Sequence, residues 1–86
     1  MDDAADLQAQ IVALRLAVEG IWLSVLRADA NGLREAQRLH GENVASVAQL
    51  AGTTTEQRAM RDAVAGHTRA LWGSIVWQLQ QPPEQR

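Results

Sequence analysis

The sequence predicts an all-α protein with three helices, and three observations support this fold class. The 86 residues are rich in alanine, glutamine, leucine and arginine, and tryptophan is the only aromatic residue. Strong helix formers of this kind favour helices over strands. Apolar residues recur at helical spacing in two long segments, and two groups of turn and cap residues divide the chain into three. We therefore expect an up-down-up three-helix bundle with long first and third helices and a weaker second one.

The first helix is expected over about residues 3–28, and its apolar residues form two rows. One row, called the heptad face below, has steps of 4, 3, 4, 3 and 4 residues, which is the spacing of a coiled-coil seam. It comprises Leu7, Ile11, Leu14, Val18, Ile21 and Val25. The other row, called the second face, lies about 150° away around the helix. It comprises Val12, Leu16, Leu23 and Leu26.

These two faces predict association between copies of the chain. A helix that is apolar on most sides must be buried on most sides, yet the second and third helices can cover one broad face, or at most one and a half. The remainder would expose a larger apolar patch than soluble monomers usually carry, and a twofold partner is the commonest solution. The sequence leaves open whether the two copies run parallel or antiparallel. The expected oligomer interface comprises Leu7, Ile11, Leu14, Val18, Ile21, Trp22 and Val25, with Trp72 and Trp77 from the third helix.

The second helix is expected over about residues 33–51, after a turn that ends in Asn31-Gly32. Gly41 weakens its middle by about 1 kcal/mol relative to alanine. This helix is therefore expected to be the least stable of the three, and the sequence leaves open whether it breaks at Gly41.

The boundary between the second and third helices is the clearest in the chain. Gly52 is expected to end the second helix in the left-handed conformation. Two alternative capping boxes follow it, Thr53 with Glu56 or Thr54 with Gln57.

The third helix is expected over about residues 54–81, where two consecutive prolines stop it. Residues 1–81 then form a single helical domain, and residues 82–86 form a frayed tail.

The same boundary resembles a DNA-binding motif. Residues 47–54 read VAQLAGTT, which is similar to the V-A-x-x-A-G-V-S of the first helix and turn in lactose-repressor-type helix-turn-helix domains. The resemblance implies an alternative function, DNA binding through residues 44–61. Its contact residues would be Thr53, Thr54, Arg58 and Arg61. The sequence departs from the family at Thr53, which replaces an apolar turn residue. It departs again after Thr54, because Arg58 and Arg61 stand where the family has apolar residues.

Several other functions are not expected. The two histidines, His40 and His67, are not spaced as metal ligands, and the chain has no cysteine. No phosphate-binding glycine loop or nucleophile motif is present, so we expect neither catalysis nor a cofactor. A net charge of −2 gives no general attraction to nucleic acid.

A membrane location is not expected either. Arg15 and Glu19 interrupt the apolar stretch, and we expect Glu19 to pair with Arg15 or with an arginine of a partner. The acidic N-terminus lacks the basic region of a secretory signal. The sequence thus predicts a cytoplasmic, non-catalytic protein–protein interaction module that acts as an adaptor, regulator or inhibitor. Its expected partners are a second copy and another protein.

Overall fold

Helices make up most of the chain that the computed structural model describes, which is residues 2–50 and 52–81. In this part of the chain α1 spans Asp3–Arg27, α2 spans Gly32–Ala48 and α3 spans Thr55–Gln80. The prediction of an all-α fold with three helices is confirmed. The observed ends agree with the predicted ones to within a residue, except that α2 ends at Ala48 instead of near residue 51. The predicted tail, residues 82–86, lies outside the described residues.

Side chains cap α1 and α3 where the sequence offers cap residues. The carboxylate of Asp2 accepts a hydrogen bond of 2.7 Å from the amide of Ala5. At α3, the Thr54 hydroxyl accepts a hydrogen bond of 3.0 Å from the amide of Gln57. The Gln57 side chain in turn accepts one of 3.2 Å from the Thr54 amide, so the second of the two predicted capping boxes forms.

The turn between α2 and α3 is built differently from the prediction. No described residue has a positive φ, so Gly52 does not take the left-handed conformation and that expectation is wrong. Instead, the guanidinium of Arg58 donates hydrogen bonds to the carbonyl oxygens of Gly52 and Thr53, at 3.5 and 3.3 Å. A Cβ atom on Gly52 would lie 2.8 Å from a guanidinium nitrogen of Arg61. Arginines from the first turns of α3 thus close over this turn.

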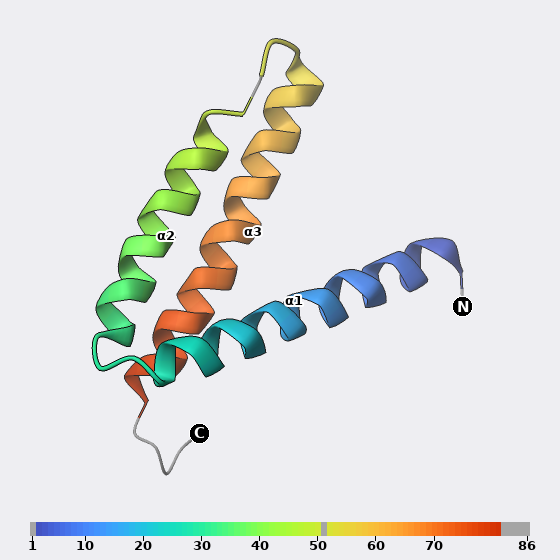
Figure 1. Cartoon of the computed structure of the whole chain (residues 1–86). Coiled ribbons are helices and arrows are strands. Elements are labelled where there is room, and N and C mark those ends of the chain that lie inside the picture. The colour runs from blue at the N-terminus through green and yellow to red at the C-terminus, as the bar shows by residue number, and fades with distance from the viewer. Residues whose placement is uncertain (1, 51, 82–86) are drawn as a thin grey trace.

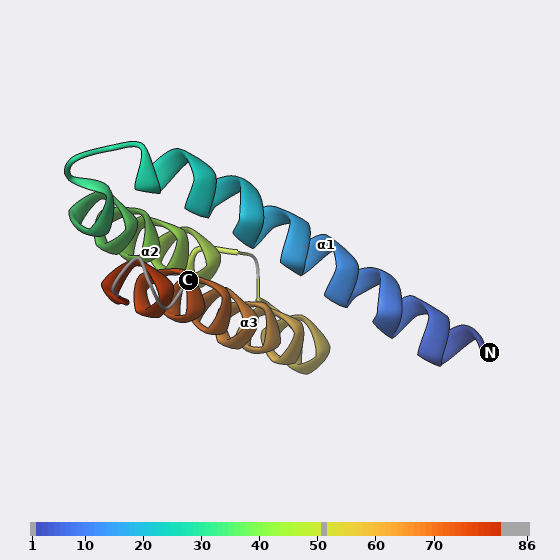
Figure 2. The same cartoon turned by 90° about the horizontal axis from the view of Figure 1, so that it is seen from below.

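The three helices do not pack together along their full lengths. Figures 1 and 2 both show α2 and α3 side by side and antiparallel, as a helical hairpin. In Figure 1, α1 meets the base of this hairpin and then diverges from it. The radius of gyration is 15.2 Å, whereas a compact chain of this length has about 12 Å. The N-terminal part of α1 is therefore an arm that extends away from the hairpin.

The core lies at the base of the hairpin, where all three helices meet. The rings of Trp22 and Trp72 pack against each other with centroids 5.4 Å apart. The buried apolar residues of the described chain are Leu23, Leu26, Ala36, Trp72 and Ile75. Five such residues make a thin core for a chain of this size, and small domains bury a smaller fraction of their surface than large ones.

The two glycines of α2, Gly32 and Gly41, differ in how closely other atoms approach them. Gly41 lies inside a continuous helix, and no described atom outside its own helix comes within 4 Å of a Cβ placed there. The helix is therefore not broken at Gly41. Gly32 is the first residue of α2 and is buried. A Cβ at Gly32 would clash with the carbonyl oxygen of Leu26 and lie 2.9 Å from its carbonyl carbon, so the close approach of α1 and α2 requires this glycine.

Candidate interaction surface

The heptad face of α1 is exposed along its whole length. Its side chains range from 38% exposed at Val18 to 66% exposed at Leu14. The full set is Leu7, Ile11, Leu14, Val18, Ile21 and Val25. These six residues, which the sequence assigned to an oligomer interface, share one side of α1 and form a continuous apolar stripe.

The second face explains why the heptad face stays free. Leu23 and Leu26, near the C-terminal end of α1, are 7% and 2% exposed because they pack into the core. Val12 and Leu16, in the same row, are 52% and 62% exposed because they lie in the part of α1 that has diverged from the hairpin. The hairpin thus contacts the second face, and only at one end of it. The heptad face is centred about 150° around α1 from that row. Its residues Ile11, Leu14 and Val18 border a groove beside α3, and they stay exposed because α1 diverges from the hairpin there.

A groove opens where α1 diverges from α3. Its volume is about 610 Å3, and Ile11, Leu14 and Val18 of the heptad face form part of its wall. The α3 side of the groove consists of Val64, His67, Thr68 and Leu71. The sequence did not place His67 beside α1, because the neighbours of His67 depend on the angle at which α1 leaves the hairpin.

The three tryptophans that were also predicted at the interface are not equivalent. Trp72 is 3% exposed and belongs to the core of the chain itself. Trp22 is partly buried against it. Trp77 is 61% exposed. In the described structure, Trp77 alone of the three has most of its surface exposed.

One buried charge accompanies the core. Glu19 is 8% exposed, and its carboxylate accepts a hydrogen bond of 3.5 Å from Nε of Arg15. Of the two pairings expected for Glu19, the one with Arg15 forms on α1. Arg15 also forms part of the groove wall, so the pair lies between the core and the groove.

The residues predicted to contact DNA under the alternative function lie at the turn between α2 and α3, and most of them form hydrogen bonds within it. Thr54 caps α3, and Thr53 donates hydrogen bonds to the side chain of Gln57. Arg58 donates hydrogen bonds to backbone carbonyls of the turn. Nε of Arg61 lies 3.7 Å from a carboxylate oxygen of Asp62. In a helix-turn-helix, the two helices cross at about 90–120°, whereas α3 runs antiparallel alongside α2 (Figures 1 and 2).

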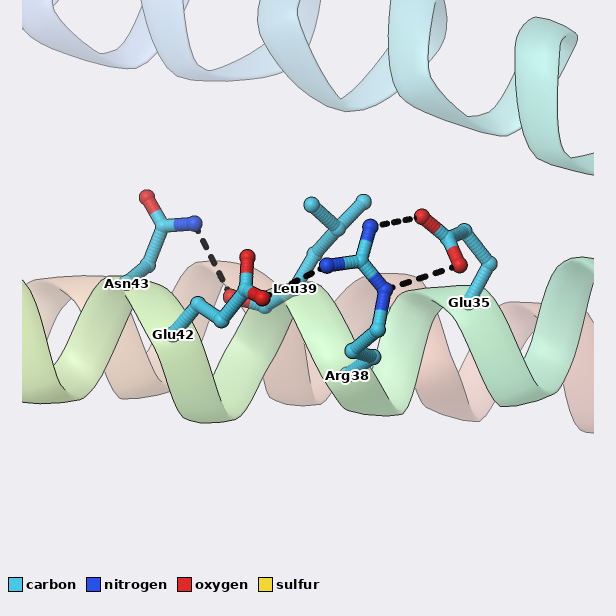
Figure 3. Close-up of polar contacts among 5 residues, drawn as sticks. All are labelled: Glu35, Arg38, Leu39, Glu42 and Asn43. Atoms are coloured by element: carbon cyan, nitrogen blue, oxygen red, sulfur yellow. Dashed lines mark hydrogen bonds and ion pairs between the residues drawn. The ribbon is translucent and has the colours of Figure 1, made fainter.

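A second group of charges lies on the exposed side of α2 (Figure 3). The guanidinium of Arg38 donates to both carboxylate oxygens of Glu35 and, at 2.6 Å, to Glu42. The hydrogen bond from Arg38 holds the pKa of the Glu35 carboxyl below its ordinary value of 4.5. Both acids pair with a cation on the same helix, so this cluster stabilises α2 and offers no unpaired acid for catalysis. Among the described residues, no group of three potential metal ligands comes together.

By length and composition, α1 would also be able to cross a membrane. This finding differs from the expectation that Arg15 and Glu19 make the stretch too polar. The other residues of α1 are apolar enough to offset these two charges, and little of the helix is buried inside the chain. Lipid is therefore a second environment that an experiment must distinguish from a protein partner.

Comparison with known proteins identifies no relative. The sequence matches no known family model, and no curated protein or solved structure is significantly similar to it. The function must therefore be argued from the surface itself.

Proposed function

We propose that this chain is a small, non-catalytic protein–protein interaction module that works as a helical homo-oligomer in the cytoplasm. Its role is that of an adaptor, regulator or inhibitor. One observation carries the proposal: all six residues of the heptad face are exposed in the isolated chain. A stripe with coiled-coil spacing is typical of a helix that pairs with another helix.

The different environments of the two faces of α1 support this proposal. The hairpin uses the second face, so the heptad face is not needed for the core of the chain. An exposed apolar stripe of five helical turns costs solubility unless another molecule covers it. A second copy carries the same stripe at the same concentration, and a twofold pair buries both at once.

The membrane alternative is weaker because of the pair that Arg15 forms with Glu19. Both residues lie near the middle of the segment that would cross the bilayer. Charged residues at the centre of a membrane helix cost about 2.5–3.5 kcal/mol each on insertion scales. Burial of α1 against a second copy leaves Arg15 at the edge of the interface, where water still reaches it.

Two aspartate substitutions on α1 test the proposal. Leu14 belongs to the heptad face and is 66% exposed, whereas Leu16 lies outside it and is 62% exposed. Since both side chains are exposed in the isolated chain, neither Leu14→Asp nor Leu16→Asp removes a core contact. Only Leu14→Asp places an unpaired carboxylate in the proposed interface, which costs several kcal/mol.

The masses of the two variants are compared with that of the unmodified chain by light scattering at tens of micromolar. We expect the unmodified chain and Leu16→Asp to be dimers and Leu14→Asp to be a monomer. Equal masses for all three proteins would contradict the proposal that the heptad face holds the oligomer together.

A further inference from the structure

We infer that two copies pair through their α1 helices in antiparallel orientation, so that the arm of each chain lies against the anchored end of the other. This inference rests on the proposed function and adds the geometry of the pair. It follows from three features: the register of the heptad face, the unequal support of its two ends, and the charges at the ends of α1.

The register allows full overlap of the two heptad faces. The heptad face alternates between two seam positions along α1. When the two helices run antiparallel, a residue at one seam position lies opposite a partner residue at the other seam position. The opposed pairs are then Leu7 with the partner's Val25, Ile11 with the partner's Ile21, and Leu14 with the partner's Val18. No heptad residue is left without a counterpart, and the overlap extends to Ala4 opposite the partner's Ala28.

The support of the two ends favours the antiparallel orientation. The hairpin anchors the C-terminal end of α1 through Leu23 and Leu26, while the N-terminal arm has no such contact. In a parallel pair, the two unsupported arms would contact only each other. In an antiparallel pair, each arm packs on Ile21 and Val25 of the anchored end, which are 64% and 56% exposed and already held in place.

The end charges favour the same orientation. The first turn of α1 carries Asp3 and Asp6 after the cap Asp2, and its last turn carries Arg27. A parallel pair would bring the two acidic first turns together, with Asp3 close to the seam in both copies. An antiparallel pair separates the acidic turns by the length of α1 and also opposes the two helix dipoles. At that separation salt screens the repulsion between the acidic turns almost completely.

Spin labels can measure this orientation without interference, because the chain has no cysteine. A label at Ala4→Cys reports the orientation. In an antiparallel pair, two such labels are separated by about 24 residues along the helices, or about 36 Å at 1.5 Å per residue. In a parallel pair they are separated by about 8–10 Å, the spacing of packed helices. Ala4 is exposed, so the substitution removes no core contact.

A label at Ala17→Cys is the matched control. Ala17 is also an exposed alanine of α1, but it lies near the middle of the overlap, where both orientations give a short distance. We expect the long distance for Ala4→Cys and the short one for Ala17→Cys. Short distances at both positions would overturn the antiparallel orientation and leave the proposed function standing. If neither labelled variant showed dipolar coupling between two copies, both the antiparallel orientation and the proposed homo-oligomer would be overturned.

A vesicle experiment tests lipid as the other occupant of the heptad face. The labelled chains are mixed with phosphatidylcholine vesicles and separated by flotation. We expect the protein to remain in the aqueous fraction with unchanged distances. Flotation of the protein with the vesicles, together with loss of the coupling, would show that lipid covers α1 and would overturn the inference.

Discussion

The two ends of α1 have similar apolar content and opposite environments. On the second face, Leu23 and Leu26 near the hairpin are 7% and 2% exposed, while Val12 and Leu16 on the arm are 52% and 62% exposed. The difference arises because α2 and α3 meet α1 only at the base of the hairpin. Apolar content therefore indicates which surfaces need cover, and the placement of neighbouring helices decides which of them the chain itself covers.

Leucine-to-alanine substitutions at the two ends should give the largest contrast. Leu26→Ala removes a buried side chain from a core of five apolar residues and should lower the free energy of unfolding by about 2–5 kcal/mol. Leu16→Ala, on the arm but outside the heptad face, should change it by no more than about 0.5 kcal/mol. Urea unfolding followed by circular dichroism, at one fixed protein concentration, measures both values. Equal losses would mean that the arm packs as tightly as the base.

Glycine substitutions sharpen the comparison at the base. Gly32→Ala forces a methyl group against the carbonyl of Leu26 and should cost about 1–3 kcal/mol, as overpacking usually does. Gly41→Ala meets open space and should stabilise the chain by some tenths to about 1 kcal/mol. Thermal unfolding of the two variants should shift in opposite directions. A destabilising Gly41→Ala would indicate a close contact at Gly41 that the isolated chain lacks, such as one with a second copy.

The smallest effect should come from the exposed charge cluster on α2. Arg38 lowers the pKa of Glu35 in the folded chain, so this pair stabilises the fold above the ordinary pKa of a glutamate. The contribution is lost as the pH falls through the lowered value. A titration of the Glu35 carboxyl by NMR should have its midpoint below 4.5, and Arg38→Ala should raise the midpoint. An unchanged midpoint in Arg38→Ala would show that the pair does not persist in solution.

Local features of the fold could be predicted from the sequence because local residues determine them. The capping box of Thr54 and Gln57 and the pairing of Arg15 with Glu19 depend on residues three or four positions apart. The prediction for Gly52 was wrong because Arg58, six positions away, supplies the hydrogen bonds at that turn. A side chain that reaches back over a turn is not visible in the local pattern.

The position of α1 could not be predicted, because the sequence offers two apolar faces and does not say which one the hairpin takes. Leu16 and Leu23 belong to the same row, yet one is exposed and the other buried. Leu23 lies in the part of α1 that contacts the hairpin, and Leu16 lies beyond that part. For the same reason, Trp72 was predicted at a surface and lies in the core. That one of the two faces would stay exposed was predicted, since they lie too far apart for one neighbour to cover both.

Sedimentation equilibrium of the unmodified chain tests the central claim most directly. If a second copy covers the heptad face, the mass at tens of micromolar should be twice the 9.4 kDa of the chain and should fall on dilution. A single species of 9.4 kDa, fully helical by circular dichroism at that concentration, would contradict the claim. The heptad face would then remain exposed in a stable monomer.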